Sequence, residues 1–263
     1  MIVLETGFYG IDYDLKSPRV GATPYAGTVA ASTAATGFDA AFAANTNTYE
    51  YWKPTALPAT WEVDFGSAKT VSYFGIAAHD LATQGATVEY QTWDGSAWTT
   101  RVTHAPADNS AIFGLLTPRS ISKARIHITG TTMPMIGVVY FGSVVEFPQK
   151  TAYAGAEFQD MVSEDYRTNS SDTGHWLGRY VTRRGQPVSM SVNHLSEVWK
   201  SAVLDPLIAD MRSRPVFIAD RPGIFDKSVA FAYSTGPITP ERTIARATVA
   251  YSVSFGLVGY VAA

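Results

Sequence analysis

A segment near residue 60 carries the clearest secondary-structure pattern in this chain. Trp61, Val63 and Phe65 alternate with polar residues, the period-2 pattern of a strand that buries one of its two faces. A glycine-bearing turn follows, and residues 71–78 form a second apolar segment. We therefore predict two strands of a sheet that has one buried face, which places this region in a β-rich class.

Strand patterns recur through the first half of the chain. The predicted strands are 60–65, 71–78, 86–93, 97–103, 111–116, 122–129 and 136–146. Asp94-Gly95-Ser96 between two of them predicts a tight hairpin. Because no helical periodicity interrupts this part, it predicts an all-β sandwich.

The second half combines strands with one helix. Its predicted strands are 179–184, 187–193, 215–219, 228–234 and 243–255. The first two are expected to meet in a turn at residues 185–186. Apolar spacing predicts a helix over 194–212, capped by Asn193 or Ser196 and kinked or broken at Pro206. This order of elements is typical of an α+β domain.

Three segments follow from these patterns. Residues 1–17 form an N-terminal strand, with alternation over 9–13, that could join the C-terminal domain. Residues 18–147 form the sandwich and residues 148–263 the α+β domain. We expect the chain to divide near Gln149, because the apolar faces of the sandwich should find their partners within it.

Composition excludes several classes of protein. The 263 residues include no cysteine, so disulfides, thiolate metal sites and a cysteine nucleophile are absent. The net charge is −3 and neither half is strongly basic, which disfavours sequence-specific nucleic-acid binding. No apolar run reaches membrane-spanning length, and the N-terminus lacks a basic signal-peptide region. We expect a soluble chain made in a cytoplasm, with no membrane insertion.

Catalytic motifs are missing from the sequence. The five histidines form no H-E-x-x-H pair, and there is no nucleophile elbow, P-loop or G-x-G-x-x-G. His127 alternates with Arg125 and Thr129 on a strand face expected to be solvated. The prediction is therefore no enzyme, no catalytic residue and no cofactor. A glycan hydrolase with carboxylates at the domain junction is the weakest alternative.

Four aromatic residues are candidates for carbohydrate binding: Tyr49, Tyr51, Trp93 and Trp98. The two tyrosines lie in a polar loop, and the two tryptophans flank the predicted hairpin turn. Sugar rings present apolar C–H faces that stack on aromatic planes. A cross-strand structural pair is an equally good interpretation for the tryptophans.

The first half resembles the coagulation-factor F5/8 type C (discoidin) family, a galactose-binding-like β-sandwich or jelly roll. The resemblance covers roughly 18–147 and lies in Tyr51-Trp52, Thr60–Gly66, Tyr73–Ala77, Ala124–Gly130 and Ile136–Gly142. It implies a module that binds glycans or other exposed surface groups without catalysis. It also implies that Trp52 and Trp61 are core residues.

Members of this family often hold a structural calcium ion in their early loops. Asp39, Asn45 and Thr48 occupy the corresponding stretch here, and oxygen ligands on an irregular loop suit calcium. The Asp-Gly-Asn type of run that the family uses is absent. The metal assignment therefore stays open.

The second half resembles the ring-forming domains of tailed-phage tail proteins, of the tube and distal-tail class. The resemblance lies in the order of Gly174–Arg179, the helix at 194–212 and Arg214–Ala219. It implies a structural component of a phage-type tail tip or baseplate, assembled in the host cytoplasm and located in the virion tail. The implied partners are copies of the chain in a ring, other tail proteins and a host-surface glycan.

An alternative is a stand-alone oligomeric carbohydrate-binding protein, lectin-like and of bacterial origin. In the ring interpretation we expect residues 151–263 to drive assembly, because edge strands and an apolar end, Leu257–Val261, lack predicted partners. In the lectin interpretation the second domain oligomerises or anchors the protein, and an oligomeric sandwich beside a monomeric C-terminal half would favour it.

Overall fold

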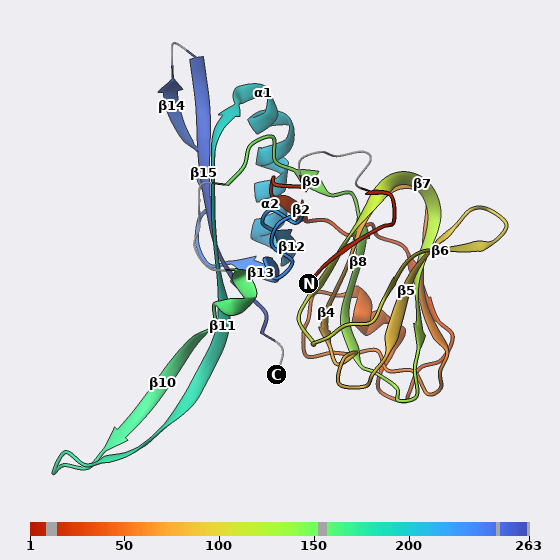
Figure 1. Cartoon of the computed structure of the whole chain (residues 1–263), viewed down its shortest axis with the longest axis horizontal. Helices are drawn as coiled ribbons and strands as arrows, with labels where there is room; N and C mark the ends of the chain where they lie inside the picture. Colours follow the sequence, from red (N-terminus) through yellow and green to blue (C-terminus); the bar gives the residue numbers. More distant parts are fainter. Residues whose placement is uncertain (9–14, 152–156, 246–247, 262–263) are drawn as a thin grey trace.

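The computed structural model describes residues 1–8, 15–151, 157–245 and 248–261. A β-sandwich forms one side of the molecule, and a second sheet with one helical segment forms the other (Figure 1). The predicted fold class, a mainly β protein with a sandwich and an α+β part, is confirmed. The strand alternation predicted at Tyr9, Ile11 and Tyr13 lies outside the described residues.

Seven strands make the sandwich: β1 (Ile2–Leu4), β3 (Thr28–Ala31), β4 (Ala59–His79), β5 (Thr87–Trp93), β6 (Trp98–His104), β7 (Ile112–Thr129) and β8 (Ile136–Gly142). Their order is β3-β4-β7-β5-β6, with β8 on β4 and β1 on β7. A short 3₁₀ helix, η2 (Ala40–Ala44), precedes β4.

The long strands β4 and β7 each contribute to both layers of the sandwich. They run antiparallel, and their register jumps between Asp64 and Lys69. Before this bend β4 pairs with β3, and after it β4 pairs with β8. Trp61 from the first part contacts Phe141 of β8, with ring centroids 6.1 Å apart. The predicted alternation therefore points into a core between the layers, where Trp61 is 2% exposed.

The second sheet contains eight strands: β2 (Arg19–Gly21), β9 (Val145–Glu146), β10 (Ser163–Ser170), β11 (Trp176–Ser196), β12 (Val216–Ala219), β13 (Val229–Ser234), β14 (Glu241–Ala245) and β15 (Thr248–Gly259). Their order is β10-β11-β15-β13-β12-β2-β9, with β14 on β15. Thus β2 and β9, from inside the predicted sandwich range, belong to this sheet. By contrast, β1 pairs in parallel with β7 and joins the sandwich.

Two expectations about the second half are wrong. The predicted turn at residues 185–186 is instead the middle of β11, where the strand changes partner from β10 to β15. Gly185 serves close packing there, because a Cβ atom would lie 2.9 Å from Val258 Cγ1. The apolar end at Leu257 is also not unpartnered, since β15 pairs with both β11 and β13 and Leu257 is buried.

The helical segment consists of α1 (Glu197–Trp199), a π-helical turn η4 (Lys200–Leu204) and α2 (Asp205–Ser213). The Ser196 hydroxyl accepts a hydrogen bond from the Trp199 N–H at 3.2 Å, so Ser196 is the N-cap. Pro206 lies in the first turn of α2, directly after the π turn. At the position where the sequence predicts a break before this proline, the helix continues as a wider π-helical turn. A separate 3₁₀ turn, η3 (Phe158–Asp160), precedes β10.

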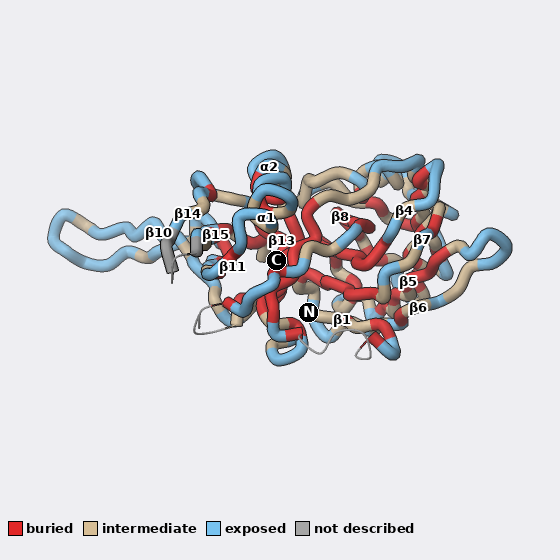
Figure 2. The backbone as a smooth tube through the Cα atoms, turned by 90° about the horizontal axis from the view of Figure 1, so that it is seen from above, coloured by how far each residue is buried: buried red, intermediate tan, exposed pale blue. Residues whose placement is uncertain are grey.

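The second sheet lies between the helix and the sandwich. Along β12, Val216 and Ile218 belong to the core cluster with the helix, while Phe217 and Ala219 belong to another cluster on the opposite face. That second cluster includes the sandwich residues Tyr73, Ala77, Phe113, Leu115, Val138 and Tyr140. Buried backbone accordingly runs through the middle of the molecule in Figure 2. The sandwich therefore does not satisfy all its apolar faces internally, contrary to expectation.

His79 ends β4 with a buried side chain. Its Nε2 lies 3.0 Å from the Ser110 carbonyl oxygen, and its Nδ1 accepts from the Leu81 N–H at 3.4 Å. Burial lowers the pKa of His79 to about 4, against the opposing effect of the Ser110 hydrogen bond. The folded state therefore takes up this proton less readily than the unfolded chain.

This pKa shift predicts acid sensitivity. The stability that neutral His79 contributes is complete above pH 6.5, and it is lost as the pH falls from 6.5 to about 4. The loss amounts to about 3 kcal/mol. Urea unfolding at pH 7 and pH 4 should show this decrease in the wild type and a correspondingly smaller one in His79→Gln, which cannot titrate. Equal decreases in both proteins would contradict the prediction.

Candidate functional site

The β5–β6 hairpin presents the two candidate tryptophans at its tip. Trp93 and Trp98 are direct cross-strand partners. Between them, Asp94 Oδ1 accepts hydrogen bonds from the Ser96 and Ala97 N–H groups at 2.8 and 2.7 Å. These hydrogen bonds lower the pKa of Asp94, and the bond from the Ala97 N–H has the largest effect. The predicted hairpin is confirmed, and its carboxylate serves to close the turn.

The two indole rings differ in what covers them. Their centroids are 5.3 Å apart with planes tilted by 57°. The Arg125 guanidinium lies over the Trp98 ring, 4.2 Å from its centroid. Trp98 thus has Trp93 on one side and a cation over its face, so its ring is poorly placed to stack on a ligand.

Trp93 also lines a hollow at the bend of the long strands. This hollow has a volume of about 600 Å³, within the range of small-molecule sites. Its walls are Ala68 from the β4 bend, Trp93, Asp94 and Gly95 from the hairpin, Arg101 from β6, and residues 117–122 from the β7 bend. It therefore combines an aromatic ring with polar groups.

The two arginines in this hollow have different partners. Arg119 Nη2 donates to both carboxylate oxygens of Glu5, at 2.5 and 2.8 Å. Arg101 donates from Nε to Thr92 Oγ1 at 2.8 Å, and it makes no ion pair with any described residue. Its guanidinium is therefore the uncompensated positive charge among the residues that line the hollow.

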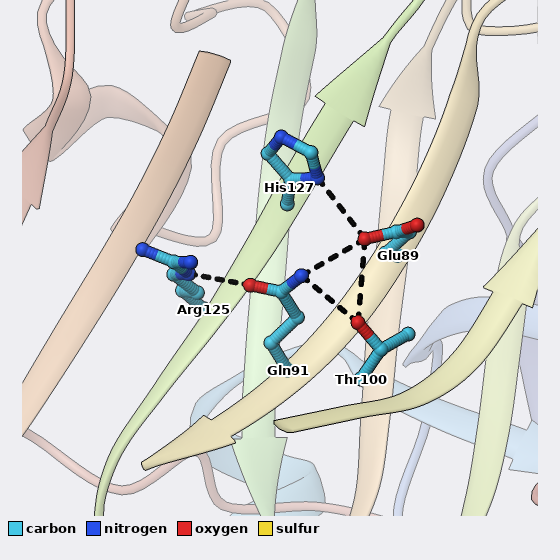
Figure 3. Close-up of polar contacts among 5 residues, drawn as sticks. All are labelled: Glu89, Gln91, Thr100, Arg125 and His127. Atoms are coloured by element: carbon cyan, nitrogen blue, oxygen red, sulfur yellow. Dashed lines mark hydrogen bonds and ion pairs between the residues drawn. The ribbon is translucent and has the colours of Figure 1, made fainter. Parts of the chain in front are cut away.

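A polar network lies on the outer face of β5, β6 and β7 (Figure 3). Arg125 Nε donates to Gln91 Oε1 at 2.7 Å, and Gln91 Nε2 donates to Glu89 Oε2 at 2.8 Å. Gln91 Nε2 also lies 3.0 Å from Thr100 Oγ1. His127, expected to be solvated, is half-buried with Nδ1 3.1 Å from Glu89 Oε2. The network fixes Arg125 over Trp98, and burial is the main reason that the pKa of Arg125 is lowered.

Tyr49 and Tyr51 lie at the other end of the sandwich. Their loop continues into Trp52, which forms a β-bridge with Ile136 at the start of β8. Ile136 in turn pairs with His79 at the end of β4, so this loop lies near that end of the strand. Tyr49 is 73% exposed. The pKa of Tyr260, the residue that follows β15, is raised mainly by burial and also by the electrostatic effect of Tyr51. The four predicted site residues thus form two separate groups.

Two of the three side chains considered for calcium, Asp39 and Asn45, use a side-chain oxygen in local hydrogen bonds. Asp39 Oδ1 accepts from the Ala41 N–H at 2.8 Å and caps η2. Asn45 Oδ1 accepts from the Asn47 N–H at 2.6 Å. Within the described ranges, no three His, Cys, Asp or Glu side chains converge on a potential metal position. Nor is any helix in those ranges both long and apolar enough to span a bilayer.

Solved structures similar to this chain include several carbohydrate-binding modules. A pectin-binding module is 15% identical, with 46% of this chain and 93% of that chain covered and a TM-score of 0.40. The family 32 module of C. perfringens NanJ in complex with galactose is 17% identical, with 48% and 99% covered and a TM-score of 0.41. The family 32 module of AlyQ in complex with 4,5-unsaturated mannuronic acid is 20% identical, with 45% and 97% covered and a TM-score of 0.39.

No protein-family profile matches the sequence. No curated protein matches it either. At these levels of similarity, a function for this chain has to come from its own residues.

Proposed function

We propose that this chain is a lectin-like carbohydrate-binding protein whose site is the hollow beside Trp93. The main support for this proposal is that the half-buried Trp93 ring lies in the wall of a hollow that Arg101 also lines. The ring offers a stacking surface for the C–H face of a sugar. The guanidinium N–H groups donate to ring or hydroxyl oxygens. Trp98, with Arg125 over it, holds Trp93 in position.

The proposed role is binding without catalysis. Glycoside hydrolysis ordinarily uses two carboxyl groups, one of them with a raised pKa. Asp94 is the one carboxylate among the residues that line the hollow, and its hydrogen bonds lower its pKa. We therefore expect no release of reducing sugar from any glycan that binds.

Trp93→Ala should weaken glycan binding at least about 10-fold, since loss of stacking and of buried ring area exceeds roughly 1.4 kcal/mol. A glycan array with the full chain selects the ligand, and calorimetric titration gives its dissociation constant. Trp176→Ala is the matched control, because Trp176 is an exposed tryptophan on another strand. Unchanged affinity in Trp93→Ala, with loss in Tyr49→Ala, would move the site to the opposite end of the sandwich.

The second candidate is a structural component of a phage-type tail tip or baseplate in the virion, which would bind copies of itself, neighbouring tail proteins and a host-surface glycan. The helix-covered second sheet with its projecting hairpin favours this role, since such an extension suits contact between subunits. The two candidates differ in assembly. A closed ring seen by light scattering or electron microscopy supports the tail component, and a small oligomer supports the lectin.

A further inference from the structure

The hairpin of β10 and the first half of β11 has no core beneath it. It extends away from the body in both views (Figures 1 and 2), and no residue from 163 to 184 is buried. Four large apolar side chains on it are exposed, namely Tyr166, Trp176, Leu177 and Tyr180. A two-stranded ribbon alone is marginally stable in water, and exposed apolar groups gathered in one place mark an interaction surface.

The outer edge of β10 is open for pairing. Among the described strands, β10 is the last in its sheet and pairs with β11 alone. An unpaired row of backbone N–H and C=O groups is a template for another strand. This edge therefore fits a partner that is itself an extended strand.

The side chains of β10 fall into two groups. On one face Glu164 pairs with Arg184 at 2.8 Å, and Tyr166 donates to Glu164 while Arg179 lies over its ring. On the other face, Asp165 and Arg167 are exposed, and their outer sides face the open edge of the sheet. Their cross-strand neighbours in β11 are Arg183 and Tyr180. Arg183 donates a hydrogen bond to the Tyr233 hydroxyl at 2.9 Å. The opposite charges of Asp165 and Arg167 stand two positions apart, with Tyr166 between them.

We propose that β10 pairs edge to edge with β10 of a second copy of this chain, antiparallel and two-fold symmetric about Tyr166. In this register each Asp165 lies opposite Arg167 of the other copy, so one ion pair forms on each side of the axis. A register centred on Asp165 would set two carboxylates against each other, and one centred on Arg167 would set two guanidinium groups together. The charge pattern of the strand thus selects both the partner and the register.

The pairing joins two hairpins into one four-stranded sheet. Such a contact is isologous and closes at two copies. It stabilises the marginal ribbon by adding strands, and it places two Trp93 hollows in one particle. A dimer of this kind gains avidity for a surface with repeated sugars, although the pairing itself does not depend on sugar binding.

The test uses charge reversal in the full chain. Light scattering with size-exclusion chromatography should give a mass of two copies for the wild type. Asp165→Arg and Arg167→Asp should each weaken the dimer at least about 10-fold, because like charges then face each other across the axis. The double variant D165R/R167D should restore it, since both pairs re-form with their signs exchanged. Asp172→Arg, an exposed control near the hairpin tip, should leave the dimer unchanged.

A crosslink provides a second, independent test. The wild-type chain has no cysteine, so Tyr166→Cys introduces a single thiol at the two-fold axis, within disulfide reach of its symmetry mate. Oxidation should give covalent dimers, whereas Thr168→Cys, two positions from the axis, should not. A monomeric wild type, a larger assembly indifferent to the reversals, or a double variant that stays monomeric would each overturn the proposal.

Discussion

Replacing Phe217 by alanine should destabilise the whole molecule by about 3–5 kcal/mol, the usual cost of removing a buried phenylalanine ring. Phe217 is fully buried on the sandwich face of β12. Its ring centroid lies 4.8 Å from that of Phe231, 5.4 Å from Tyr140 and 6.1 Å from Phe113. Two of these rings belong to the sandwich, so the cavity would open at the junction of the two parts.

Calorimetry of the wild type should show one cooperative transition for both parts, because the junction is a core cluster and not a surface contact. In Phe217→Ala this transition should move to lower temperature and broaden or divide. Met211→Ala is the matched control, since Met211 is buried on the helix side of the same sheet. It should lower the transition temperature without dividing the transition.

Two separate transitions in the wild type, with the sandwich transition unaffected by Phe217→Ala, would contradict this account. That result would instead support the division near Gln149 that the sequence suggests. From the structure, a fragment of residues 18–147 leaves Phe113 and Tyr140 without their ring contacts to Phe217 and Phe231. We therefore expect such a fragment to aggregate or to melt with low cooperativity.

The sandwich was predictable because its strands alternate or are continuously apolar. Trp61 and Phe65 point inward as their period-2 spacing requires. The junction was not predictable, because residues 71–78 read as one apolar run and no pattern says which layer covers each face. Gly75 illustrates the limit, since a Cβ atom there would lie 2.5 Å from the Phe217 ring. The need for glycine at this position becomes visible only in the packed structure.

The candidate site was predictable in part. The hairpin turn and its flanking tryptophans follow from local sequence, because turn chemistry acts over a few residues. Arg101, Arg125 and Gln91 were missed as site residues, since their roles depend on register between β5, β6 and β7. The one available signal was the strand alternation that places Arg125 and His127 on the same face. Tyr49 and Tyr51 shared the aromatic composition of the tryptophans but lie at the other end.

Trp61→Ala should be the second severely destabilising substitution, again by about 3–5 kcal/mol. The side chain is 2% exposed, packs against Phe141 from the opposite layer and donates from Nε1 to the Ala40 carbonyl at 2.8 Å. Alanine would leave a large cavity between the layers and remove the hydrogen bond from the indole that ties η2 to the core. Urea unfolding followed by circular dichroism measures the change.

Trp61→Phe separates the two contributions. It keeps an aromatic ring between the layers and removes the indole N–H, so it should cost about 1–3 kcal/mol through the unsatisfied Ala40 carbonyl and the smaller ring. Because Trp61 lies inside the sandwich and Trp93 lines the hollow, the folded fraction of Trp61→Phe should bind glycan with wild-type affinity. A Trp61 variant with full stability and no glycan binding would place this residue in the site and exchange the roles assigned to Trp61 and Trp93.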